Sequence, residues 1–227
     1  MIHNCHRRLF PCNTPVQLRL SQWRDLRGCY CQAVSVINER QKMKRVLIVG
    51  CPGAGKSTLA KQLAKVTGLP LVHLDKLYWL PGWQRPDSAT WQKTIEGLVS
   101  RPAWIMDGNY SGTLEQRLAS ADTLIHLDYP TWLCLCRVIR RTIGGLGRNR
   151  DDELAPGCPE RFDWSFLRFV INYRNDQRER DLARMAGFPG RVFRFSSPSR
   201  LSSFVAAIEL AADKRSRQDT GTNSRSF

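Results

Sequence analysis

The sequence predicts an α/β fold in which a parallel sheet is covered by helices on both faces. Between residues 43 and 212, short apolar runs alternate regularly with amphipathic helical patterns, which is the order of repeated strand–helix units. A second observation is the glycine-rich stretch Gly50–Ser57, which lies between the first apolar run and the first helical pattern. Ligands of open parallel sheets bind beyond the carboxyl ends of the strands, so we expect the functional residues to follow strands.

The first half of this region predicts three strands and three helices. The first helix should stop at Gly68, because glycine readily adopts the left-handed conformation that ends helices. Asp87 or Ser88 can cap the next long helix, since short polar side chains accept hydrogen bonds from its first N–H groups. The predicted elements are strands Arg45–Val49, Leu69–Leu74 and Ala103–Met106 and helices Lys56–Thr67, Ala89–Ser100 and Leu114–Ala119.

The second half predicts two more strands and three more helices. Strand Thr123–Leu127 precedes a helix whose predicted apolar face is Trp132, Leu133, Leu135, Cys136, Val138 and Ile139. Residues 143–162 are rich in glycine, arginine and acids and contain two prolines, which predicts a mobile lid segment. The remaining predicted elements are a long helix over Asp163–Met185, a strand over Arg191–Phe195 and a helix over Pro198–Ala212.

The two ends of the chain do not follow this alternation. Residues 1–42 mix Cys, Arg, Trp and Pro with little periodicity, and Met43 stands two residues before the first strand. Our hypothesis is that Met43 is the natural start and that residues 1–42 form a poorly ordered extension. Residues 213–227 are polar, which predicts a disordered tail after a single domain over residues 43–212.

Composition limits the compartment and the partners. No apolar run approaches the ~20 residues of a membrane span, and no apolar segment follows Arg7 and Arg8 as in a secretory signal. We therefore expect a cytoplasmic protein without a membrane partner, as a monomer or weak dimer. The eight cysteines lack the paired spacing of a zinc site and are interpreted as buried or incidental thiols.

The net charge of +15 raises the hypothesis of a nucleic-acid partner. Residues 1–42 carry +5 and residues 212–227 carry +2, which leaves +8 for residues 43–211. Much of this remainder is arginine between residues 137 and 200, where an enzyme that uses ATP would need it. The charge distribution therefore favours phosphate binding over DNA binding.

The stretch from Gly50 to Ser57 fits the phosphate-loop pattern Gly-x-x-x-x-Gly-Lys-Ser, between a strand and a helix as its mechanism requires. Its glycines let the backbone N–H groups point inward, and the helix N-terminus adds partial positive charge. Lys56 would reach the β- and γ-phosphates, and Ser57 would bind Mg²⁺. The sequence therefore predicts ATP and Mg²⁺ as cofactors, with a nucleotide-binding set of Gly50, Pro52, Gly53, Ala54, Gly55, Lys56, Ser57 and Thr58.

Two acidic residues that follow strands are candidate catalytic groups. Asp107 ends the third strand, where an acid can hold Mg²⁺ directly or through water; the alternative is a turn residue before Gly108. Asp75 ends the second predicted strand and could act as general base on an acceptor hydroxyl; the alternative is a cap for the following segment.

Arginine suits phosphate because its planar fork binds oxygens in pairs and stays charged. Arg137 is the first candidate for stabilising the transferred group, followed by Arg141 and Arg174; the alternative is a solvated basic face. The aromatic residues Tyr78, Trp79, Trp83 and Trp91 could stack on an acceptor or pack a small subdomain. His73 and His126 lie inside strand patterns and are interpreted as core histidines.

With these residues assembled, the chain resembles the adenylate-kinase-like group of P-loop kinases, and within it the branch of DNA topology modulation proteins. The phosphate loop indicates nucleotide binding only, whereas the Asp-Gly-Asn-Tyr stretch at 107–110 and the Gly-Cys-Pro-Glu-Arg-Phe stretch at 157–162 point to the branch. The matching segments are Val46–Thr58, Leu74–Trp79 with Pro81-Gly82-Trp83, Trp104–Tyr110, Ala121–Pro130 and Gly157–Asp163.

The resemblance implies a P-loop NTPase three-layer sandwich, with a five-stranded parallel sheet of order 2-3-1-4-5 and a lid over the phosphates. It also implies that Lys56 and Ser57 hold ATP and Mg²⁺, that Asp107 supports the metal, and that Arg137 and Arg141 belong to the lid arginines. Adenylate kinases follow the Asp-Gly pair with Phe-Pro-Arg, whereas this chain has Asn109-Tyr110-Ser111, which weighs against AMP as acceptor. Nothing in the sequence resembles a DNA-reading module.

These observations predict an ATP- and Mg²⁺-dependent kinase acting on a small-molecule or nucleotide acceptor, with Lys56, Asp107, Arg137, Arg141 and Asp75 as its catalytic residues. The alternatives are a nucleotide-dependent regulatory protein that affects DNA topology, and a simple ATPase.

Overall fold

In the computed structural model the described residues are 43–148 and 153–222, with side chains described as far as Asp213. The predicted extension over 1–42, residues 149–152 of the predicted lid, and residues 223–227 lie outside this part of the chain. The hypothesis about Met43 as natural start therefore remains a prediction.

The centre of the fold is one parallel sheet. Its strands are β1 (Arg45–Gly50), β2 (Leu71–His73), β3 (Trp104–Asp107), β4 (Thr123–Leu127) and β5 (Arg191–Phe195), in the order β2-β3-β1-β4-β5. The register pairs Ile48 with Asp107, and Gly50 with Leu127. The strands therefore end at one edge of the sheet, and the predicted α/β class and strand order are confirmed.

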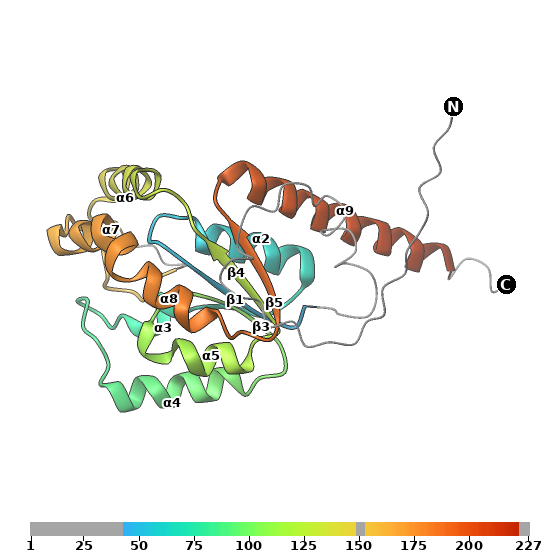
Figure 1. Cartoon of the computed structure of the whole chain (residues 1–227), viewed down its shortest axis with the longest axis horizontal. Coiled ribbons are helices and arrows are strands. Elements are labelled where there is room, and N and C mark those ends of the chain that lie inside the picture. Colours follow the sequence, from blue (N-terminus) through green and yellow to red (C-terminus); the bar gives the residue numbers. More distant parts are fainter. Residues whose placement is uncertain (1–42, 149–152, 223–227) are drawn as a thin grey trace.

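Helices cover both faces of the sheet (Figure 1). The helices are α2 (Lys56–Thr67), α3 (Leu74–Tyr78), α4 (Ser88–Val99), α5 (Leu114–Ser120), α6 (Thr131–Gly145), α7 (Trp164–Asp176), α8 (Arg178–Met185) and α9 (Pro198–Thr222). A hydrophobic core lies on each face of the sheet. Strand β1 contributes side chains to both cores, because successive side chains of a strand point to opposite faces. Val46 and Ile48 pack with α2, α6, α7 and α9, whereas Leu47 and Val49 pack with α4 and α5.

Several predicted elements differ from the structure by a residue at one end or both. The first three residues of the predicted lid, 143–145, belong to α6, and three further elements differ more. The second strand ends at His73, and Leu74 starts α3, so Asp75 lies in the first turn of a helix instead of closing a strand. The long helix predicted over Asp163–Met185 is two helices that meet at Gln177, whose side chain bonds to Ser111 and Asp181. The last helix continues to Thr222, so the first part of the predicted polar tail is helical.

The predicted apolar face of α6 is wrong in part. Its buried residues are Cys134, Val138 and Thr142, a single stripe with the four-residue spacing of one helix face. Trp132 is 66% exposed and Cys136 is exposed, because they lie off this stripe.

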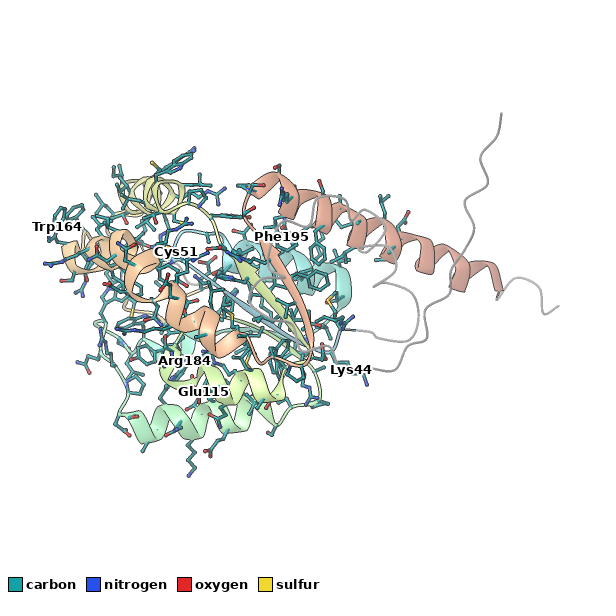
Figure 2. All side chains as sticks on the ribbon, in the orientation of Figure 1. Lys44, Cys51, Glu115, Trp164, Arg184 and Phe195 are labelled. Atoms are coloured by element: carbon teal, nitrogen blue, oxygen red, sulfur yellow. The ribbon has the colours of Figure 1, made fainter. Side chains whose placement is uncertain are left out.

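Helices α5 and α8 contact each other at the molecular surface. Arg184 of α8 lies 3.5 Å from the carboxylate of Glu115 of α5, and both are labelled in Figure 2. Within the described residues, no helix combines the length and apolar character needed to cross a membrane.

Candidate functional site

A cleft of about 1160 Å³ opens at the carboxyl edge of the sheet. The residues that line it come from the phosphate loop, α3 and the turn after it, the segment after β3, helices α6 and α7, residues 153–163 and the start of α9. The loop begins at Gly50, the last residue of β1, and continues with Cys51, which Figure 2 labels. The cleft therefore joins the predicted nucleotide-binding loop to segments distant in sequence.

The phosphate loop has the backbone that its glycines predict. Gly53 and Gly55 have φ angles of 81° and 93°, in the left-handed region that favours glycine. A Cβ atom on Gly53 would clash with the Cys134 carbonyl oxygen, so a larger residue would push the loop away from α6. Gly55 caps α2 without a side-chain hydrogen bond, which leaves first-turn N–H groups available to an anion.

Two predicted cations lie against this loop. The Nζ atom of Lys56 donates to the carbonyl oxygens of Gly50 at 2.9 Å and Cys51 at 3.2 Å. Nη1 of Arg137 donates to the Ala54 carbonyl at 3.3 Å, and its guanidinium lies 5.7 Å from the Tyr129 ring centroid. Both side chains line the cleft, so the structure brings two of the predicted catalytic cations to one loop.

The other predicted arginines have different positions. Arg141 lines the cleft on the side of the predicted lid, with its Nε atom 3.3 Å from the carboxylate of Glu160. Arg174 lies on the exposed part of α7, away from the residues that line the cleft. Of the three arginine candidates, the structure therefore brings Arg137 and Arg141 into the cleft and leaves Arg174 outside it.

Asp107 lies at the end of β3 and is 5% exposed. Its Oδ1 atom is 2.7 Å from Nδ1 of His73, the residue opposite it on β2. Asp107 and Ser57 both line the cleft, and carboxylate and hydroxyl oxygens are suitable ligands for Mg²⁺. Within the described residues, no three His, Cys, Asp or Glu side chains are grouped so that they could hold a metal ion. Both residues therefore offer the kind of oxygen ligand that a magnesium ion bound to nucleotide phosphates needs, and the magnesium site remains a prediction.

The sequence did not predict the contact between His73 and Asp107. A signal was present, because a histidine and an aspartate at the carboxyl ends of neighbouring parallel strands must come close.

Asp75 is held by a tyrosine from another segment. The Tyr110 hydroxyl donates to Oδ1 of Asp75 at 2.6 Å. Burial, reinforced by the charge of Asp75, raises the pKa of Tyr110 well above its usual range, so the phenol remains a donor at neutral pH. Asp75 and Tyr110 also line the cleft, and their contact is a feature that sequence patterns did not reveal.

Arg117 supports the segment that carries Asp107 and Tyr110. Its guanidinium donates to the carbonyl oxygens of Gly108 at 2.9 Å, Tyr110 at 2.9 Å and also Asn109. The side chain is fully buried, and burial lowers its pKa to about 10. The sequence did not predict this role for Arg117. Its partners are backbone oxygens, which every residue type has, so no residue pattern indicates the contact.

Asn109 connects this segment to the phosphate loop. Its Oδ1 atom accepts from the Gly50 N–H at 2.9 Å, and its Nδ2 atom donates to the Tyr173 hydroxyl at 3.3 Å. Tyr173 in turn donates to Asp181 at 3.3 Å. A chain of hydrogen bonds therefore runs from the loop through Asn109 to helices α7 and α8.

Asp128, the acid at the end of β4, belongs to the scaffold. It accepts from Arg178 at 2.7 and 2.8 Å and from Arg194 at 2.9 Å. Burial alone would raise its pKa, but the hydrogen bonds from the two arginines outweigh burial and hold the pKa well below the usual range. His126, also in β4, is fully buried, and burial lowers its pKa to about 4, in agreement with its interpretation as a core histidine.

The aromatic residues after β2 divide between packing and the cleft. Tyr78 packs edge-on against Trp91 with ring centroids 4.9 Å apart, and Trp91 is buried. Trp79 and Trp83 line the cleft instead. Both interpretations of the cluster therefore describe part of it.

The strand order and the phosphate loop together define a protein with the P-loop NTPase fold. No protein-family model matches the chain. A stretch of 40 residues is 52% identical to the shikimate kinase of Parabacteroides distasonis and spans 18% of this chain and 22% of that enzyme.

Solved structures give broader but weaker matches. A gluconokinase from Sinorhizobium meliloti 1021 is 15% identical, with a TM-score of 0.44 over 83% of this chain and 100% of that one. The shikimate kinase from Acinetobacter baumannii in complex with shikimate is 16% identical, with a TM-score of 0.43 over 84% and 98%. Membership in the DNA topology modulation branch remains a prediction.

Proposed function

We propose that this protein transfers the γ-phosphoryl group of ATP, with Mg²⁺, to a hydroxyl of a small-molecule acceptor. The observation that carries this proposal is the continuity of the cleft. The phosphate loop with Lys56 and Ser57 lines this cleft, and Asp75 and Tyr110 line the same cleft; we call the first group of residues the donor end and the second the acceptor end. A donor nucleotide and an acceptor can therefore share one cavity, which phosphoryl transfer requires.

In this mechanism the loop N–H groups and Lys56 bind the β- and γ-phosphates. Ser57 and Asp107 would hold Mg²⁺, which when bound would supply positive charge to the phosphate oxygens. Asp75, oriented by Tyr110, accepts the proton of the acceptor hydroxyl as its oxygen bonds to phosphorus. The bond between the γ-phosphorus and the bridging oxygen breaks, and ADP leaves. Arg137 and Arg141 stabilise the charge on the transferred group.

The test is ADP release from purified protein with ATP and Mg²⁺ in the presence of nucleoside monophosphates, nucleosides and small hydroxy compounds. We expect at least one hydroxy compound to raise ADP release well above the rate with water alone. Equal, slow release with every acceptor would contradict the kinase and favour the simple ATPase.

A titration of the same protein with duplex DNA tests the regulatory alternative. We expect weak binding that ATP does not change. Tight binding that falls steeply with salt and responds to ATP would instead support the regulatory protein.

A further inference from the structure

The acceptor end of the cleft contains two residues with unusual backbone conformations. Within residues 43–148 and 153–222, the non-glycine residues with positive φ are Trp83, at 61°, and Tyr110, at 36°. Both line the cleft. Large side chains rarely adopt this region, and such strain persists only where the surroundings enforce it, often at functional sites.

The strained turn at Trp83 is hydrogen-bonded to the segment that carries Arg161. Nε1 of Trp83 donates to the Pro159 carbonyl at 3.1 Å. The Gly82 N–H donates to the Gly157 carbonyl at 2.8 Å. The position of the Trp83 indole is therefore set by contacts to residues more than seventy positions later in the chain.

Two arginines lie over the indole rings at this place. The Arg85 guanidinium carbon is 5.3 Å from the Trp79 ring centroid, and that of Arg161 is 5.4 Å from the Trp83 centroid. The two indole rings are 5.3 Å apart and contact each other edge to face. We call Trp79, Trp83, Arg85 and Arg161 the arginine–tryptophan cluster; all four line the cleft.

This arrangement suits recognition of an anion. An indole face holds a guanidinium group in place through a cation–π contact and leaves the N–H edges free to donate. Arg161 has a carboxylate neighbour, Asp163, at 3.8 Å, but the Arg161 side chain is 57% exposed, so that pair is weak. Pre-positioned guanidinium edges favour carboxylate or phosphate oxygens.

The cluster lies next to the predicted base. The backbone N–H of Trp79 donates to the backbone carbonyl of Asp75 at 3.1 Å, so the two residues are one helical turn apart. The Tyr78 ring contacts both the Trp79 ring and the Tyr110 ring, with centroids 5.2 and 4.5 Å apart, and Tyr110 donates to the carboxylate of Asp75. Asp75 would repel an anionic group and favour a hydroxyl. The acceptor end therefore combines a hydroxyl position at Asp75 with an anion position at the arginines.

We infer that the acceptor is a small hydroxylated organic anion, whose carboxylate or phosphate binds Arg85 and Arg161 while a hydroxyl lies at Asp75. This inference rests on the proposed function. It assigns the anionic group to binding and the hydroxyl to reaction, so a nucleotide that reacts through its phosphate is excluded.

The experiment compares matched acceptors with and without a negative charge. Hydroxy acids are paired with their amides, and sugar phosphates with their parent sugars, and ADP release is measured with ATP and Mg²⁺. We expect the charged member of at least one pair to be the better acceptor by at least tenfold in kcat/KM. The two kinds of pair distinguish carboxylate from phosphate.

Variants then test the residues. In Arg85→Gln and Arg161→Gln the KM for the charged acceptor should rise about 10- to 100-fold, the equivalent of a charged hydrogen bond worth ~1.5–3 kcal/mol, and the KM for ATP should rise much less. Arg101→Gln is the matched control, because Arg101 is an exposed arginine after α4 that does not line the cleft; both constants should stay at the parent values. Melting temperatures check that each variant folds.

Neutral acceptors that work as well as charged ones, or Arg85 and Arg161 variants that match the Arg101 control, would overturn this inference while the kinase stands. Transfer to the phosphate of a nucleoside monophosphate would also overturn it. Failure of every acceptor would instead remove the proposed function, and this inference with it.

Discussion

The two ends of the cleft are built in different ways. The donor end is one continuous stretch, from Gly50 to Thr58, whose shape depends on glycine backbone angles and on the start of α2. The acceptor end is assembled from lining residues within 75–85, 110–111 and 160–163. It depends on contacts such as Tyr110 to Asp75 and Trp83 to Pro159, across 35 and 76 positions.

This difference shows why a sequence pattern can predict the donor site but not the acceptor site. A phosphate loop is recognisable because its residues are neighbours in the chain and its ligand, a polyphosphate, is shared by many proteins. An acceptor site brings together distant residues for one particular ligand. We therefore expect changes at the donor end to affect every activity, and changes at the acceptor end to depend on the acceptor.

The largest expected effect is at the donor end. In Lys56→Ala, both phosphoryl transfer and hydrolysis of ATP should fall by on the order of 10³-fold or more, since a cation that faces the transferring group can contribute this much. Steady-state ADP release measures both activities. Lys65→Ala, in the last turn of the same helix, is the control and should behave as the parent protein. Equal rates in the two variants would show that Lys56 does not contact the phosphates.

The second-largest expected effect is at the acceptor end, and it should affect phosphoryl transfer more than ATP hydrolysis. Asp75→Asn should lower transfer to a hydroxyl acceptor by at least about 10²-fold, because a positioned base supplies about 10²–10⁴-fold. Hydrolysis of ATP should fall much less, so the ratio of transfer to hydrolysis is the quantity to measure. Tyr110→Phe, which keeps the ring but loses the hydroxyl bonded to Asp75, should give a smaller loss of the same kind. A loss of transfer far below tenfold in Asp75→Asn would exclude an essential base.

Arg117 should matter for stability, since it supports the segment between the two ends. Arg117→Met leaves the carbonyl oxygens of Gly108, Asn109 and Tyr110 without their donor, and we expect a loss of about 3 kcal/mol in the free energy of unfolding. Urea denaturation measures it. The control is Glu115→Gln, which removes the exposed carboxylate of the ion pair with Arg184 and should cost less than about 1 kcal/mol. Equal losses would show that the buried contacts of Arg117 contribute no more than the surface pair.

Sequence patterns predicted the local parts of the molecule well. The bounds of β4, β5 and α2 match the predicted ranges, because apolar runs and a terminal glycine are local signals. The meeting of α7 and α8 at Gln177 was not predictable, since the Gln177 side chain bonds to Ser111, 66 positions earlier. The contacts of Arg117 with backbone oxygens also leave no trace in residue types.

The smallest effect should come from Asn109, where the two ends meet. Asn109→Leu removes the acceptor of the Gly50 N–H, and one lost hydrogen bond of about 1 kcal/mol should raise the KM for ATP by about fivefold. Tyr173→Phe keeps Asn109 as the acceptor for Gly50 and loses only the hydroxyl to which Asn109 donates, so its KM for ATP should lie nearer the parent value. If both variants raise the KM for ATP equally, the loop depends on the whole chain of hydrogen bonds from Gly50 to Tyr173, and the donor end is then no longer a local structure.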